Sequence, residues 1–201
     1  MRPTLQSTLL LLFCSLLLQH TVLAQYEENE RIYKKWRFEG MMGYARPSGP
    51  GNKAGVLLSF EPKYNVTDQL SVGLRNELTA MARGYIDVNG NSFTGKAGAG
   101  LSFLVTGDYF FTNTLVRPFA GAGAGIYNLF QAEVNTSGNQ VVNLPSVTKP
   151  GLMLRTGVDL WHLRAAIEYN LVGKTGEVNN NYLGLKIGIV IGGGPNRINE
   201  E

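Results

Sequence analysis

Apolar and polar residues alternate with a period of two through most of the chain after residue 35, which is the pattern of β-strands with one apolar and one polar face. The clearest example runs from Lys96 to Phe130, where two alternating segments flank the turn Phe111-Thr112-Asn113-Thr114. One face of this hairpin is apolar to its ends, while the other carries charged residues and glycines. Both segments are longer than the ~5–6 residues of an average strand. Such a hairpin is typical of strands with lipid on one side and a polar lumen on the other.

The same alternation predicts eight strands, joined alternately by long and short connections. The short connections are expected at Thr67-Asp68, at 111–114 and at Trp161-His162. The long connections, rich in turn-forming residues, are expected at 46–52, 83–95, 131–149 and 172–180. This asymmetry predicts an all-β fold, an eight-stranded antiparallel up-and-down transmembrane β-barrel with tight periplasmic turns and long external loops. An even number of strands places both ends of the barrel on the periplasmic side.

The composition of the chain divides it into four parts. Residues 1–24 have the features of a cleaved signal peptide, with Arg2 at the start, an apolar run from Leu9 to Leu18 and small residues up to Ala24. A transmembrane anchor is the alternative, but the apolar run is shorter than the roughly 20 residues that a spanning helix needs. Residues 25–35 are expected to form a flexible periplasmic lead-in, 36–191 the barrel, and 192–201 a polar tail. The only cysteine, Cys14, lies in the signal peptide, so the mature chain has neither disulfide nor thiol chemistry.

A soluble lipocalin-like barrel is the alternative fold with eight strands, but it needs apolar residues inside and polar residues outside. In this chain the charged residues share one face of every strand, and an apolar band of this size would cause aggregation in water. Aromatic residues on the apolar face lie near the strand ends and are expected to form the two girdles at the membrane interfaces. They are Trp36, Phe38, Tyr64 and Tyr109 toward the short turns, and Tyr44, Phe130 and Tyr169 toward the long loops.

The predicted lumen face collects eight cations and six anions. They are Arg37, Glu39, Glu61, Lys63, Arg75, Glu77, Lys96, Asp108, Arg117, Arg155, Asp159, Arg164, Glu168 and Lys186. Because an eight-stranded barrel is only wide enough for side chains to fill it, we favour a plugged core of ion pairs and hydrogen bonds. The alternative is a narrow channel with Lys96, Arg117 and Lys186 as selectivity residues. Inward glycines bear on this choice, since they either leave open space or accommodate bulky Arg and Tyr side chains. They are Gly98, Gly100, Gly121, Gly123 and Gly125.

Motifs that would indicate an enzyme or a cofactor are incomplete. Gly173-Lys174-Thr175 resembles the end of a phosphate-binding loop, but Glu168 replaces the earlier glycine. The sole histidine after the signal peptide, His162, falls in a predicted periplasmic turn, whereas an embedded hydrolase or acyltransferase needs a histidine near the outer rim. Without cysteine or a second histidine, no transition-metal site and no cofactor are expected. A net charge of +3 gives no indication of a nucleic-acid partner.

Three segments carry a resemblance to a known family. They are Glu61-Pro62-Lys63-Tyr64-Asn65, Arg117-Pro118-Phe119-Ala120-Gly121, and Leu163-Arg164 with Glu168-Tyr169-Asn170. Over about residues 36–191 the chain resembles the small outer-membrane β-barrel family common in Bacteroidetes, which is similar in architecture to OmpA/OmpX-type barrels. The resemblance implies the outer membrane of a Gram-negative bacterium, contact with outer-membrane lipid, and periplasmic chaperones and the barrel-assembly machinery as partners during biogenesis. It implies no shared catalytic residues.

The expected function is therefore that of a non-enzymatic, monomeric barrel whose ion-paired body displays four loops for surface contact or envelope integrity. A narrow, porin-like passive channel is the alternative, and an embedded lipid-modifying enzyme that uses His162 is a third possibility.

Overall fold

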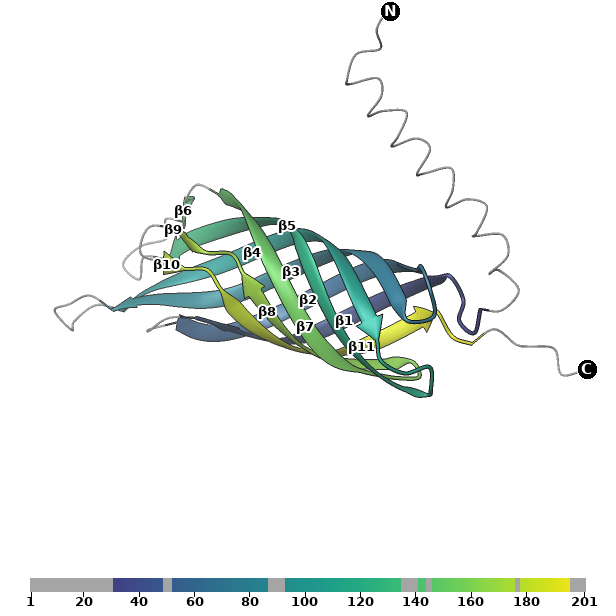
Figure 1. The fold of residues 1–201 in the computed structure, drawn as a ribbon. Helices are drawn as coiled ribbons and strands as arrows, with labels where there is room; N and C mark the ends of the chain where they lie inside the picture. The colour runs from purple at the N-terminus through teal and green to yellow at the C-terminus, as the bar shows by residue number, and fades with distance from the viewer. Residues whose placement is uncertain are drawn as a thin grey trace, which may run out of the picture.

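The computed structural model describes residues 31–48, 52–86, 93–134, 141–143, 146–175 and 178–195. The predicted signal peptide, 1–24, lies outside the described residues. The strands are β1 (Trp36–Pro47), β2 (Asn52–Asn65), β3 (Leu70–Ile86), β4 (Phe93–Phe110), β5 (Val116–Val134), β6 (Val141–Asn143), β7 (Val147–Leu160), β8 (Leu163–Leu171), β9 (Lys174–Thr175), β10 (Val178–Asn179) and β11 (Tyr182–Gly192) (Figure 1).

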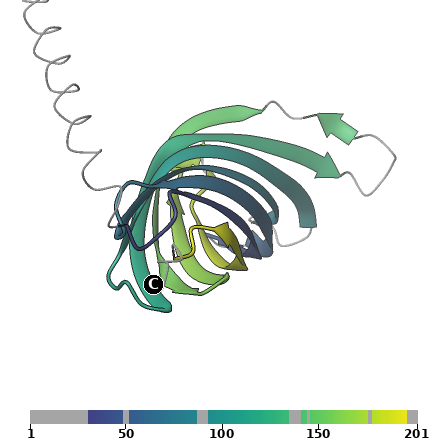
Figure 2. The ribbon, with the colours of Figure 1, turned by 90° about the vertical axis from the view of Figure 1, so that its right-hand side faces the viewer.

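Eight strands form a closed antiparallel barrel. Their order in the main sheet is β4-β3-β2-β1-β11-β8-β7-β5, and a further pairing of β4 with β5 closes the ring. The short strand β6 extends the sheet beside the end of β5, and β9 and β10 form a separate two-stranded sheet. Figure 2 views the barrel from the end that holds Tyr33 and Pro195 and shows the strands curving around a common axis. The predicted fold class is confirmed.

The two faces of the barrel wall have opposite polarity, as the alternation predicts. Along β1 the exposed and buried residues alternate, and Met42 is 62% exposed whereas its neighbour Met41 is 3% exposed. Met42 pairs with Leu58 of β2 on one side and with Ile187 of β11 on the other, so exposed apolar side chains form a continuous band across strands. The polarity is the reverse of that in a soluble barrel. Apolar side chains exposed in a continuous band are stable in contact with lipid but not with water. The band is therefore the surface of a transmembrane barrel.

No helix among the residues that the structure describes is long and apolar enough to cross a membrane.

The short connections lie together at one end of the barrel, which we call the turn end, and comprise 66–69, 111–115 and 161–162. Trp161 has a backbone φ of 55°, and this left-handed conformation lets only two residues join β7 to β8. The opposite end, which we call the loop end, carries the connections near 48–51, 87–92, 135–146 and 172–181.

Strands at the loop end are longer than the sequence predicts. Arg46 and Pro47 belong to β1, β3 and β4 stay paired until Ile86 meets Phe93, and β5 continues to Val134. The predicted loops at 46–52, 83–95 and 131–149 are therefore partly strand, and the predicted loop at 172–180 contains β9 and β10. The physical reason is that a strand beyond the lipid has water on both faces. Its backbone ladder continues without the alternation that marks the membrane-spanning part.

Residues 31–35, expected to form a flexible lead-in, lie across the turn end and are held there by hydrogen bonds. The backbone N–H of Tyr33 donates to Asp68 Oδ1 at 3.0 Å, and the backbone N–H of Lys34 donates to the Gly194 carbonyl at 3.0 Å. Tyr33 also forms an isolated β-bridge with Pro195. Gly193, with a φ of 63°, turns the chain out of β11 toward this contact, in a conformation that side chains rarely adopt. We call residues 31–35 the strap.

If the outward face borders lipid, an arginine at its middle should destabilise the barrel. Leu58 is 58% exposed near the middle of β2, and we expect Leu58→Arg to lower the free energy of unfolding in lipid vesicles by about 2–4 kcal/mol. The control is Val66→Arg in the turn at 66–69, where an interfacial arginine should cost about 0–1 kcal/mol. Equal costs for the two variants in a denaturant titration would contradict a lipid-facing Leu58.

Candidate functional site

The predicted lumen charges lie inside the barrel, and each of them with a described side chain is at most 6% exposed. These are the cations Arg37, Lys63, Arg75, Arg117, Arg155, Arg164 and Lys186 and the anions Glu39, Glu61, Glu77, Asp108, Asp159 and Glu168. The backbone of Lys96 is part of β4, but its side chain lies outside the described part of the chain. The period of two placed these residues on one face, and closure of the sheet brings together side chains that are far apart in the sequence.

Asp108 of β4 is the centre of the network in the half of the barrel nearer the turn end. Its carboxylate accepts from Arg155 Nε at 2.6 Å and from Arg164 Nη2 at 2.6 Å, and it also pairs with the Lys63 ammonium. Arg155 then binds both oxygens of Glu61, at 2.7 and 2.8 Å, in the two-pronged geometry that suits a guanidinium and a carboxylate. The charged carboxylate offsets the cost of burying the three cations around it. This stabilisation is lost if the carboxylate loses its charge.

A second cluster, around Glu168 of β8, continues the network toward the loop end. Glu168 pairs with Lys186 at 2.6 Å and with Arg75, and lies 3.6 Å from Arg155 of the first cluster. Lys186 also pairs with Glu77. The network therefore runs without interruption along the barrel axis, and its members come from seven of the eight barrel strands.

Tyrosine hydroxyls and an asparagine end the network on the side of the loop end. Tyr182 donates its hydroxyl to Glu77 at 2.5 Å, and Tyr127 donates its hydroxyl to Asn170 Oδ1 at 2.8 Å. Asn170 Oδ1 also accepts from Arg75 Nη2 at 2.8 Å. Because Tyr127 and Tyr182 have apolar rings and polar tips, they join the ionic layer to the layer above it.

An apolar cluster that includes the rings of these two tyrosines fills the barrel toward the loop end. It consists of Ala45, Leu57, Met81, Leu104, Tyr127, Leu129, Met153, Val172 and Tyr182, each at most 5% exposed. An apolar layer inside the barrel was not predicted, although Leu104 and Met153 alternate in step with the charged residues Asp108 and Arg155 on β4 and β7. The interior is thus a polar network capped by an apolar layer, rather than ion pairs throughout.

Three of the five lumen glycines, Gly100, Gly121 and Gly123, are covered by neighbouring side chains. A Cβ atom at Gly123 would lie 3.1 Å from Met153 Cε, one at Gly100 would lie 2.6 Å from Thr79 Oγ1, and one at Gly121 would lie 3.2 Å from Arg155 Nε. These distances are too short for a side chain to be added without displacement. At Gly121 the neighbour is an arginine, as one of the two interpretations that the sequence left open proposes. At Gly125 a Cβ atom would instead meet the backbone of Phe103 and Leu104.

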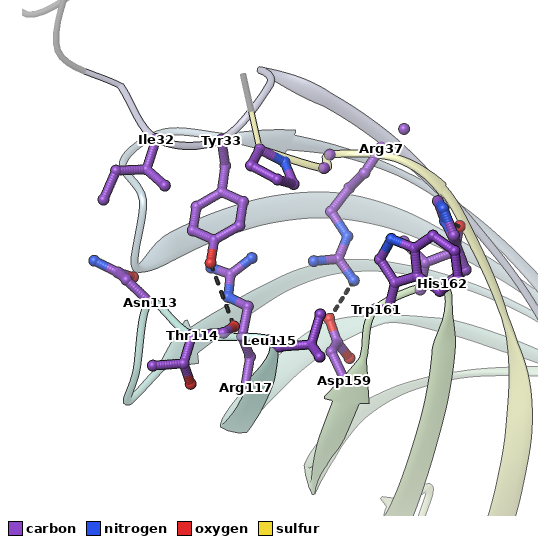
Figure 3. Close-up of a pocket in the computed structure, with 15 residues that line it drawn as sticks. Ile32, Tyr33, Arg37, Asn113, Thr114, Leu115, Arg117, Asp159, Trp161 and His162 are labelled. Atoms are coloured by element: carbon purple, nitrogen blue, oxygen red, sulfur yellow. Dashed lines mark hydrogen bonds and ion pairs between the residues drawn. The ribbon is translucent and has the colours of Figure 1, made fainter. Parts of the chain in front are cut away.

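A pocket of about 300 Å³ opens at the turn end, bounded by the strap and by the turns at 111–115 and 161–162 (Figure 3). Its floor holds the ion pair between Arg37 and Asp159, with Nη2 and Oδ2 2.6 Å apart. Tyr33 of the strap lies over the guanidinium of Arg117, with the ring centroid 3.8 Å from Cζ. Tyr33 could not be found from the alternation, because it precedes the first strand.

His162 also lines this pocket, in the turn where the sequence predicted it. Its Nδ1 lies 2.9 Å from the Val190 carbonyl oxygen, and its ring packs against Trp161 with centroids 4.5 Å apart. Within the described part of the chain, no three His, Cys, Asp or Glu side chains gather in an arrangement that could hold a metal ion.

The predicted girdle aromatics all lie on the outward face. Six of them, all except Tyr64, are at least 37% exposed. Trp36 and Tyr64 of neighbouring strands pack edge to face, with centroids 5.2 Å apart, and the Tyr109 hydroxyl bonds to Gln69 Oε1 at 3.2 Å. These contacts hold Trp36, Tyr64 and Tyr109 near the turn end of β1, β2 and β4.

Removing the charge of Asp108 should weaken the barrel strongly, since three buried cations would lose their shared anion. We expect Asp108→Asn to lower the free energy of unfolding by about 3–5 kcal/mol in a denaturant titration of the refolded protein. Asp68→Asn is the control, because the Asp68 side chain accepts from backbone N–H groups of the strap at the barrel end, and an amide oxygen keeps the shorter of these two bonds, from Tyr33. A loss for Asp108→Asn no larger than that of the control would show that the network does not hold the barrel together.

Solved structures with a fold similar to this one include two bacterial barrels. The neisserial surface protein NspA matches with a TM-score of 0.56 and 20% identity, over 80% of this chain and 98% of that protein. The outer membrane protein OprG from Pseudomonas aeruginosa matches with a TM-score of 0.51 and 14% identity, over 81% of this chain and 98% of that protein. Neither a protein-family model nor a curated protein matches the sequence. The chain has the fold of the small eight-stranded outer-membrane β-barrels.

Proposed function

We propose that this protein is a non-enzymatic outer-membrane barrel with a closed lumen, which acts as a rigid platform for the structures at its loop end. In this proposal the signal peptide is cleaved on export, and periplasmic chaperones and the barrel-assembly machinery insert the barrel as a monomer. The turn end then faces the periplasm and the loop end faces the cell exterior.

The packed interior is the observation that supports a closed lumen. A channel needs a continuous row of water molecules along its axis, but here the axis is occupied in three successive layers. Arg37 and Arg117 lie at the turn end, the network around Asp108 and Glu168 fills the middle, and the apolar cluster around Leu104 fills the remainder. Lumen cations such as Arg155 and Lys186 are each paired with two or three carboxylates, so their charge is already neutralised within the barrel and does not attract a passing solute.

A packed interior also favours a scaffold role over a transport role. Cross-barrel ion pairs, such as Arg155 of β7 with Glu61 of β2 at 2.7 Å, fix the distance between strands on opposite sides of the barrel. A barrel held in this way gives the connections at its loop end fixed anchor points, and functional contacts are commonly made by loops on a rigid scaffold. In this proposal the function is contact with a partner at the cell surface or support of envelope integrity. That function depends on those connections and not on the lumen.

The test is single-channel recording with the refolded protein in a planar bilayer. We expect no discrete conductance steps, while a general porin added to the same bilayer gives steps of its usual size. Folding of the inserted protein is checked by circular dichroism of the same preparation in vesicles. Reproducible steps from folded protein would contradict the closed lumen and would establish the passive channel in its place.

A further inference from the structure

The pocket at the turn end combines apolar walls with one unusual cation. The walls are formed by Ile32, Leu115, Trp161, Val190 and Pro195. The cation is Arg117, which is 6% exposed and lines the pocket beneath the strap (Figure 3). The pocket has a volume of about 300 Å³, at the lower end of the range for pockets that bind small molecules.

Arg117 is the lumen cation that has no carboxylate within ion-pair distance among the described side chains. Its Nη2 donates to the backbone carbonyl of Asp68 at 2.5 Å, and its Nε has no partner. The described lumen contains one more cation than carboxylates, and Arg117 is that extra charge. A buried charge without a counter-ion is costly, so a protein that retains one at the edge of a cavity has a place for an anion.

Two aromatic rings fix the direction from which an anion can reach Arg117. Its Cζ atom lies 3.8 Å from the ring centroid of Tyr33 and 4.1 Å from that of Phe110. Because Cζ lies over both rings, the rings obstruct an approach to the guanidinium from the sides that they occupy. The approach that remains is in the plane of the guanidinium, where its N–H groups point and where a planar carboxylate binds with two parallel hydrogen bonds.

The charge of the pocket limits the ligand to one negative charge. Asp159 lies in the same wall, and its carboxylate is neutralised by Arg37 and Arg164, at 2.6 and 3.0 Å. Arg117 therefore supplies a single uncompensated positive charge. A carboxylate matches it, whereas a phosphate monoester carries about −1.5 to −2 at neutral pH and would leave an excess beside Asp159.

We propose that the pocket is a binding site for a small carboxylic acid with a short apolar or aromatic body, held by Arg117 and covered by Tyr33. The carboxylate lies in the guanidinium plane, and the apolar body lies against Leu115 and Trp161. The strap forms one wall of the site, so binding and anchoring of the strap stabilise each other. The site lies at one end of the lumen, and its occupancy does not depend on whether the barrel conducts.

The test uses benzoate as the probe and the full refolded protein in a non-ionic detergent. Binding is followed through the backbone amide resonances of Leu115, Gly193 and Gly194, which lie around the pocket. We expect saturable shifts with benzoate and at least tenfold weaker binding of benzyl alcohol and benzylamine. These two probes have the same ring but lack the negative charge.

Variants assign the binding to Arg117. Arg117→Gln should weaken benzoate binding at least tenfold, whereas Arg46→Gln, an exposed cation near the loop end, should leave it unchanged. Arg117→Lys keeps the charge but loses the two-pronged geometry, so it should weaken binding several-fold, and it provides the test if the glutamine variant does not fold. Equal binding of benzoate and benzyl alcohol, or native affinity in both Arg117 variants, would overturn the proposal. Because the recording of conductance is separate, failure of this site is distinguishable from failure of the closed lumen.

Discussion

A lipid bilayer offers no hydrogen bonds, and this constraint determines most of the structure. A sheet can cross a membrane only if its two edge strands pair with each other, and here β4 with β5 and β1 with β11 complete the ring. The apolar face must then turn outward, so the polar face encloses the axis. With eight strands the enclosed space is just wide enough for side chains, and the polar residues have to satisfy one another. The ion-pair network is thus a consequence of closing a small barrel in lipid.

The interior meets this demand in layers that differ in chemistry. Near the turn end, guanidinium groups lie on aromatic rings, as with Arg164 over Phe119 at 3.5 Å. In the middle, carboxylates shared between several cations balance almost all of the charge, and Asp108, Glu39 and Glu168 each pair with three cations. Toward the loop end, Tyr127 and Tyr182 end the network and an apolar layer begins. The charge that this arrangement leaves unbalanced is at the edge, at Arg117, where it can meet a ligand instead of a protein carboxylate.

The alternation of residues was sufficient to predict the faces of the wall but not the contacts inside it. The alternation along each strand predicted that Arg155 and Glu61 face the lumen. Their bidentate pairing depends on closure of the barrel, since they come from β7 and β2. Phe110 and Leu104 lie on the same face of β4 as Asp108, but alternation alone does not show that such apolar side chains gather in layers above and below the charges. The strand ends at Ile86 and Val134 were missed because alternation is lost where both faces meet water. The strap could not be predicted at all, since Tyr33 is held by Asp68 and Pro195, which are distant in sequence.

Proton exchange at the arginine side chains tests most directly whether the lumen is a packed core or a water-filled space. In nitrogen-15 NMR spectra of the refolded barrel, the guanidinium protons of Arg75, Arg155 and Arg164 should exchange slowly with water, because each group is buried and bonded to carboxylates. The exposed Arg46 near the loop end is the internal reference and should exchange rapidly. Slow exchange at the three buried arginines is the result expected for an ion-paired core. Exchange as fast as that of Arg46 would mean that water reaches the network, and would contradict a closed barrel.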